Sequence, residues 1–179
     1  DVPTDLEAEA ISGTEIDLEW TAPQLTGGAE ITGYQIERQA EGESDFTIIV
    51  ADTGSTDTAF SNTGLLSGVQ YTYRVSAITT AGVGDPSGTA TATTFAVPDA
   101  PVLTVNAGDN TATVSWTTPA DNGSALTGYT LTITDTTDNT TETSTFDDTV
   151  NQTTVTLVNG HTYTFVVFAT NGVGNGPVS

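Results

Sequence analysis

Cysteine, methionine and lysine are absent from this chain of 179 residues, whose only basic side chains besides one histidine are two arginines. Without cysteine the chain can form no disulfide, no cysteine-ligated zinc site and no thiol nucleophile. The longest apolar stretch lies within residues 165–169. This is far short of the roughly 18 residues that a membrane-spanning helix needs, so we expect no membrane insertion.

The charge is almost entirely of one sign. There are 23 acidic residues against Arg38 and Arg74, which gives a net charge of −21. Such a surface repels phosphate backbones and anionic lipids, so we expect no nucleic-acid partner. Three explanations for the acidity remain open: solubility, adaptation to high salt in which counterions screen the self-repulsion, and binding of divalent cations such as calcium.

Helical periodicity is absent, whereas apolar residues alternate with polar ones in many short segments. Threonine, which favours strands, makes up about a fifth of the residues. We therefore predict an all-β fold. The chain opens at Asp1 with neither an initiator methionine nor a signal peptide, and we interpret it as a mature or excised fragment.

One pattern occurs twice, with its matching residues offset by 92 positions. In both copies a turn containing glycine leads into a strand that begins with tyrosine and alternates. The first copy comprises Leu65, Gly68, Tyr71, Tyr73, Val75 and Ala77, and the second comprises Leu157, Gly160, Tyr163, Phe165, Val167 and Ala169. The repeat indicates two units of similar structure.

Other features repeat in the same order. Each unit has a tryptophan followed three residues later by proline, and each has a glycine–tyrosine pair that opens a strand. These residues are Trp20, Pro23, Gly33 and Tyr34 in the first unit and Trp116, Pro119, Gly128 and Tyr129 in the second. We predict domains at residues 1–97 and 98–179, joined by a linker at residues 95–101 that Pro98 and Pro101 stiffen.

The second unit has no counterpart of one strand. In the first unit, residues 89–94 are expected to form the last strand, whereas the chain ends at Ser179, the position that matches Ser87. A threonine-rich hairpin is expected over residues 132–146, with its turn near Asp138 and Asn139.

In combination, these tryptophans, prolines, glycine–tyrosine pairs and turn tyrosines resemble the fibronectin type III domain, over nearly the whole chain. The resemblance is to the prokaryotic type found in surface and secreted proteins. It implies two consecutive seven-stranded immunoglobulin-like β-sandwiches, with strands A, B and E against C, C′, F and G, the second lacking its last strand. It also implies that Tyr71 and Tyr163 form tyrosine corners, in which the hydroxyl bonds to backbone a few residues upstream.

A missing last strand would expose the edge of the preceding one. Phe165, Val167 and Ala169 are therefore candidates for a strand-acceptor edge. Either the fragment ends early, or a neighbouring chain supplies the strand by β-augmentation, which would be strand exchange with another chain.

No catalytic residue, cofactor-binding residue or metal ligand is predicted. His161, the lone histidine, lies in a turn, lacks a serine or carboxylate partner at any motif spacing, and is interpreted as solvated. Carboxylates are the one plausible source of ligands. The clusters are Glu15, Asp17 and Glu19 on one strand, Asp147 with Asp148, and Asp135 with Asp138. None matches a calcium-binding loop, so no cofactor is predicted. Calcium is the only one considered, because the carboxylates could supply oxygen ligands.

Two further expectations concern the surface. Three N-x-S/T sequons, at Asn122, Asn139 and Asn151, are candidate glycosylation sites. Arg74 and Glu37 should form a cross-strand ion pair of under about 1 kcal/mol, since both point outward from neighbouring strands.

The function predicted is a class rather than an activity. We expect no enzyme but a structural or adhesive module of a larger prokaryotic extracellular protein, such as a surface layer, adhesin or filament. It would space and present binding surfaces, and neighbouring domains or protein subunits would be its partners. The alternatives are an accessory spacer in a secreted polysaccharide-degrading enzyme and a virion surface decoration. The localisation expected is extracellular, at the cell surface.

Overall fold

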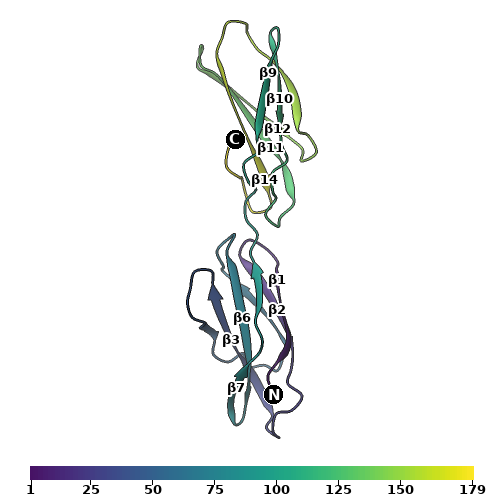
Figure 1. Ribbon diagram of the computed structural model, residues 1–179, viewed down its shortest axis with the longest axis vertical. Coiled ribbons are helices and arrows are strands. Elements are labelled where there is room, and N and C mark those ends of the chain that lie inside the picture. Colours follow the sequence, from purple (N-terminus) through teal and green to yellow (C-terminus); the bar gives the residue numbers. More distant parts are fainter. The chain divides into compact units, whose positions relative to one another are not determined.

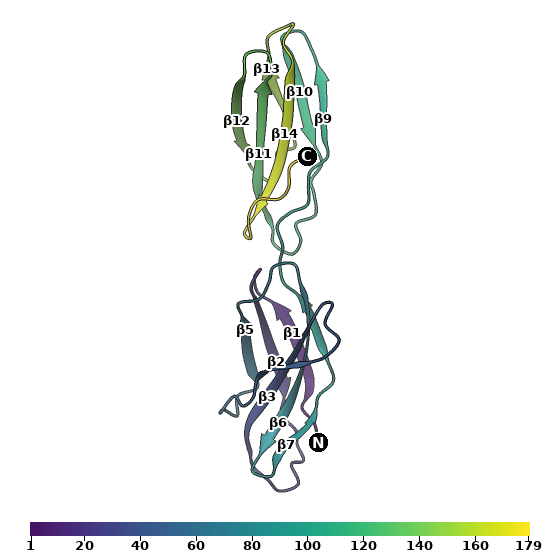
Figure 2. The same cartoon turned by 90° about the vertical axis from the view of Figure 1, so that its left-hand side faces the viewer.

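The computed structural model describes residues 1–179 and contains strands without helices. It accordingly holds no helix long and apolar enough to cross a membrane. The chain divides into two compact units, Asp1–Phe95 and Ala96–Ser179. In Figures 1 and 2 each unit is a pair of sheets packed face to face. The all-β fold predicted from the alternation and the β-sandwiches implied by the resemblance are both confirmed.

The first unit contains strands β1 to β8. Their bounds are β1 Thr4–Ala10, β2 Glu15–Thr21, β3 Ile31–Ala40, β4 Thr47–Val50, β5 Ala59–Thr63, β6 Gln70–Thr79, β7 Gly82–Pro86 and β8 Ala90–Thr93. One sheet has the order β1-β2-β5, and the other has the order β4-β3-β6-β7. Strand β8, the expected last strand, pairs with the first half of β6, and the short strand β7 pairs with the second half of β6 on the same side.

The second unit contains strands β9 to β14. Their bounds are β9 Leu103–Ala107, β10 Thr111–Trp116, β11 Leu126–Asp135, β12 Thr140–Phe146, β13 Gln152–Thr156 and β14 Tyr163–Asn171. The sheets have the orders β13-β10-β9 and β12-β11-β14. Strands β11 and β12 form the expected threonine-rich hairpin, and β14 is an outer strand of its sheet.

Alternation places the core between the sheets of each unit. On β2, Ile16, Leu18 and Trp20 are buried, while the acidic residues between them face outward. Strand β10 repeats the pattern with Val114 and Trp116. Because successive side chains on a strand point to opposite faces, this pattern determines which side of each sheet faces its partner.

Each tryptophan packs across the core against the opposite sheet. The rings of Trp20 and Tyr34 meet edge to face with centroids 5.0 Å apart. Trp116 contacts Tyr129 at 5.6 Å and Phe146 at 5.4 Å. Burying about 200 Å² of such a side chain contributes about 5 kcal/mol at roughly 25 cal/mol per Å².

Both tyrosine corners are confirmed. The hydroxyl of Tyr71 accepts the N–H of Leu66 at 3.0 Å, and the hydroxyl of Tyr163 accepts the N–H of Val158 at 2.9 Å. In each case the bond ties the start of the strand, β6 or β14, to the loop that precedes it. It thereby orders the crossover between the two sheets.

We expect Tyr163→Phe to lower the free energy of unfolding of the second unit by about 1 kcal/mol, because the Val158 N–H loses its acceptor. The matched control is Tyr129→Phe in the same unit. The Tyr129 hydroxyl is buried and has no hydrogen-bond partner, so its removal should be neutral or stabilising. Urea unfolding followed by the amide resonances of β11 and β14 measures both effects. Equal losses in the two variants would contradict the assignment.

Candidate functional site

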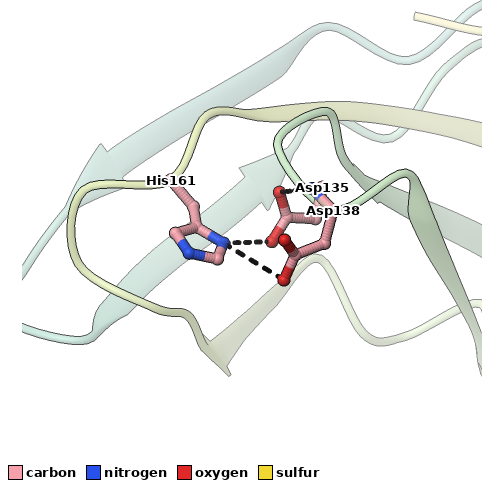
Figure 3. A group of neighbouring side chains, drawn as sticks. All are labelled: Asp135, Asp138 and His161. Carbon is pink, nitrogen blue, oxygen red and sulfur yellow. Dashed lines mark hydrogen bonds and ion pairs between the residues drawn. The ribbon is translucent and has the colours of Figure 1, made fainter.

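Three side chains from two turns of the second unit meet at one end of a sheet. Asp135 is the last residue of β11, Asp138 lies in the turn to β12, and His161 lies in the loop before β14. The imidazole Nδ1 of His161 is 2.7 Å from Oδ2 of Asp135 and 3.8 Å from Oδ2 of Asp138. Figure 3 shows both carboxylates directed toward the same ring nitrogen. We refer to these three residues as the His161 cluster.

Strand register brings the cluster together. Asp135 pairs with Tyr163 where β11 and β14 run antiparallel, so the end of one strand lies beside the start of the other. Beyond that pair, the N–H of Thr136 donates to the carbonyl of Thr162 at 2.8 Å. The N–H of Thr162 in turn donates to the hydroxyl of Thr137 at 3.0 Å. These bonds hold the β11–β12 turn against the loop that carries His161.

Local hydrogen bonds fix the Asp135 carboxylate. Its Oδ1 accepts the backbone N–H groups of Thr137 at 2.8 Å and Asp138 at 3.3 Å, which leaves Oδ2 directed at His161. Asn139 completes the turn with a positive φ of 57°, a conformation that asparagine adopts more readily than most residues.

The pKa values of the pair move in opposite directions. Burial alone would raise the pKa of Asp135, but the hydrogen bonds from His161 and from the two backbone N–H groups together lower it to about 2. The hydrogen bond to Asp135 raises the pKa of His161, against a smaller opposing effect of burial. The charged forms of both residues are therefore favoured in the folded protein.

The interpretation of His161 as a solvated turn histidine is wrong, because its ring is bonded to a carboxylate. The partner, Asp135, lies 26 residues away in sequence, and the His161 side chain is only 23% exposed. The sequence did hold a usable signal. Antiparallel pairing of the third and sixth strands of the sandwich places the end of one beside the start of the other, and both residues lie at that end.

The first unit has the same turn without the cluster. There, the N–H of Glu41 donates to the carbonyl of Gln70 at 2.8 Å, as Thr136 does to Thr162 in the second unit. The positions equivalent to Asp135, Asp138 and His161 carry Ala40, Glu43 and Val69. In the first unit this turn also has a side-chain bond, since the Glu43 carboxylate accepts the N–H of Ala40 at 2.8 Å. The His161 cluster itself is an addition found in one copy.

The other acidic residues considered as ligands are arranged differently. Asp17 and Glu19 on β2 lie directly opposite Glu9 and Glu7 on β1. Like charges facing each other across a sheet are destabilising. Only one group of three or more His, Asp or Glu residues has its ligand atoms all within 4.8 Å of one another, and it consists of Asp135, Asp138 and His161.

The expected pair of Arg74 and Glu37 is confirmed. The guanidinium donates two hydrogen bonds of 2.8 Å to the two carboxylate oxygens, and it also lies 4.3 Å from the centre of the Phe46 ring. The hydrogen bonds to Glu37 raise the pKa of Arg74. Arg38, the other base, lies 5.0 Å from the centre of the Tyr71 ring. Both arginines are thus engaged within the first unit.

The three sequon asparagines are all exposed. The side-chain nitrogen of Asn122, the atom that would carry a glycan, donates to the carbonyl of Val97 at 2.8 Å and to Asp99 at 3.0 Å. Asn139 lies in the turn of the His161 cluster, and Asn151 precedes β13. Glycosylation of the three remains a prediction.

The open edge of β14 is shorter than the predicted strand-acceptor edge at Phe165, Val167 and Ala169. The expectation of an open edge at Val167 and Ala169 is wrong, because their backbones bond to the C-terminal segment. Ser179 N–H donates to the Val167 carbonyl at 2.9 Å, and Gly176 N–H donates to the Ala169 carbonyl at 2.8 Å. This segment has no alternation of its own, which is why the sequence did not indicate it. Phe165 makes no such bond and remains a candidate.

In the first unit, the edge of β6 that is equivalent to the open edge of β14 is paired with a strand. Strand β8 pairs with Tyr71 and Tyr73 there, and both tyrosines are buried. The equivalent Tyr163 and Phe165 are only half-buried. They line a shallow hollow of about 250 Å³ together with Val105, Ala112 and Leu157.

Comparison with known proteins gives a family and several partial relatives. The family described as "Fibronectin type III domain" matches residues 1–93 and again residues 97–179. "Exoglucanase B" of Cellulomonas fimi is 35% identical over 138 residues, which is 72% of this chain and 12% of that protein. "Myosin-binding protein C, fast-type" of Mus musculus is 35% identical over 125 residues, or 66% of this chain and 11% of that protein.

Among solved structures, a two-domain fibronectin type III segment of chicken tenascin is 24% identical. It covers 100% of this chain and 97% of its own, with a TM-score of 0.45. The chain spans only 12% and 11% of the two curated relatives named above.

We expect the His161–Asp135 pair to make stability depend on pH. Because the pKa of Asp135 is lowered, its contribution is present above the ordinary value of 3.8 and is lost as pH falls toward about 2. Because the pKa of His161 is raised, its contribution is present below 6.5 and is lost as pH rises through the raised value. The pair thus stabilises the second unit most in the mildly acidic range between these limits.

The measurement compares wild type with His161→Gln by urea unfolding, with a chelator present throughout. The difference in free energy of unfolding should be larger near about pH 5.5 than near about pH 9. The same comparison in an Asp135→Asn background should show no such pH dependence, because the partner is gone. A difference that is independent of pH in the wild-type background would contradict the pairing.

Proposed function

The chain belongs to the fibronectin type III family, in two tandem copies, and on that premise we propose that it is a structural and adhesive module of a larger prokaryotic extracellular protein. Domains of this family are typically non-catalytic modules that serve structure or binding within longer chains. The parent protein would be a surface layer, adhesin or filament. Within it, the two units space and present binding surfaces to neighbouring domains or subunits.

The observation that carries the proposal is that the tryptophans and most tyrosines are buried in the cores and no aromatic side chain is among the exposed hydrophobic residues. Trp20, Trp116, Tyr34 and Tyr129 are buried between the sheets. The large hydrophobic residues left exposed are all aliphatic: Ile11, Leu25, Ile48, Leu66, Val83, Val102, Val105, Val158 and Val178. Stacking on sugars or bases needs exposed aromatic rings. The surface therefore favours spacing and protein contact over carbohydrate recognition.

The electrostatics support the same role. The net charge is −21, and the two arginines are held by Glu37 and by the Tyr71 ring rather than standing free. Uniform negative charge keeps molecules soluble and prevents unspecific association when many copies stand close together. A module that is displayed at high density on a surface needs this property.

A second candidate function has one observation in its favour. The relative "Exoglucanase B" is 35% identical over 72% of this chain, yet the match is only 12% of its length. The chain would then be an accessory spacer in a secreted polysaccharide-degrading enzyme. Both candidates place it outside the cell, and both assign it no catalysis of its own.

Surface exposure on intact cells tests the proposal. Brief protease treatment of whole cells should release peptides from the loops of this chain, with a cytoplasmic protein as the control for lysis. Peptides that appear only after the cells are broken would contradict the extracellular assignment.

The sequence on either side of the chain in its parent protein separates the two candidates. Further repeats with a surface anchor support the structural module. A domain with the paired carboxylates of a glycoside hydrolase supports the spacer instead.

A further inference from the structure

The His161 cluster offers one imidazole nitrogen and two carboxylate oxygens to a common point. The three ligand atoms lie within 4.8 Å of one another. They come from two separate loops. A backbone bond from Thr136 to Thr162 and a bond from the Thr162 N–H to the Thr137 hydroxyl hold those loops together. The cluster is therefore positioned by the fold and does not depend on the flexibility of a single turn.

The spacing suits one small metal ion. In proteins, zinc binds histidine nitrogen and carboxylate oxygen at about 2.0–2.2 Å, so two ligands of a tetrahedral ion lie roughly 3.3 Å apart. The distances from Nδ1 of His161 are 2.7 Å to Asp135 and 3.8 Å to Asp138, one shorter and one longer than that value. Shifts of about half an ångström in side chains would bring both oxygens to ligand positions.

The donor set also indicates the class of ion. Imidazole suits zinc and other late first-row divalent metals, and carboxylate oxygen completes such sites. Calcium prefers six to eight oxygen ligands, and two carboxylates beside an imidazole offer too few. Magnesium likewise favours an all-oxygen octahedron.

The cluster is open to solvent on one side. The Asp138 side chain is 63% exposed, whereas Asp135 is 10% exposed. Asp135 and Asp138 also line a hollow of about 390 Å³, along with Glu142 and Tyr163. An ion can enter from this side, and water can occupy the coordination positions that the protein leaves free.

From these observations we infer that Asp135, Asp138 and His161 bind one divalent transition-metal ion of the zinc class. The ion takes the place of the proton shared between Nδ1 of His161 and Oδ2 of Asp135, and Asp138 supplies the third ligand. It joins the β11–β12 turn to the loop before β14. The first unit, with Ala40, Glu43 and Val69 at the equivalent positions, has no such site.

The test titrates the metal-free chain with zinc chloride, using isothermal titration calorimetry for affinity and proton NMR for location. His161 is the only histidine, so its ring resonances report directly on the site. We expect one ion per chain, with saturable shifts of the His161 resonances and of amides in the β11–β12 turn. The first unit serves as an internal control, and its amides should stay unchanged.

Variants separate a specific site from the general attraction of an acidic protein for cations. His161→Gln and Asp138→Asn should each weaken zinc binding at least about tenfold, the loss that removal of even an outer-shell partner causes. Asp138→Asn is the safer variant for folding, because its side chain is exposed and lies 3.8 Å from Nδ1. Asp147→Asn removes the same charge elsewhere in the unit and should leave the affinity unchanged.

Two results would overturn the inference. One is an equal effect of Asp138→Asn and Asp147→Asn on zinc affinity, which would indicate a diffuse ion atmosphere. The other is saturation of the His161 shifts by magnesium at the same concentrations as zinc, which would show that the imidazole is not a ligand.

Discussion

Each unit depends on one tryptophan packed between its two sheets. Trp20 is 5% exposed and Trp116 is 4% exposed, and each contacts a tyrosine on the facing sheet. The chain has no disulfide, so burial of apolar surface must offset the conformational entropy that each unit of about 90 residues loses on folding. The tryptophan and the alternating residues around it form the centre of that buried surface.

The two units share the part of the core around the tryptophan and differ at its margin and in their turns. In the first unit, β8 covers Tyr71 and Tyr73, and the turn after β3 carries Ala40 and Glu43. In the second unit, β14 is an outer strand and no strand pairs with its start on that side, while the corresponding turn and the loop before β14 carry the His161 cluster. Function resides in sites added to a fold, so these two places and the acidic surface are where the units can differ in what they bind.

The sequence predicted the features that follow from local alternation and from strand order. The strands and the cross-strand pair of Arg74 with Glu37 could be derived this way. The division of the strands between two sheets and the tyrosine corners were implied by the resemblance to the fibronectin type III domain. The pairing of His161 with Asp135 was not predicted, because no local pattern links two residues 26 positions apart and only the antiparallel register of β11 and β14 brings them together. The hydrogen bonds of the C-terminal segment to Val167 and Ala169 were not predicted either, because this segment contains glycine and proline and has no strand pattern.

Hydrogen exchange of backbone amides tests most directly the claim that the units share a core and differ at the edge of one strand. Along a strand, alternate backbone N–H groups point to opposite neighbouring strands. The N–H of Val167 points toward the C-terminal segment. The N–H groups of Tyr163 and Phe165 therefore point to that same side. The account predicts slow exchange at Tyr71 and Tyr73, and at the β14 amides that bond to β11. It predicts fast exchange at Tyr163 and Phe165. Equal protection of these two pairs in a monomeric sample would contradict it.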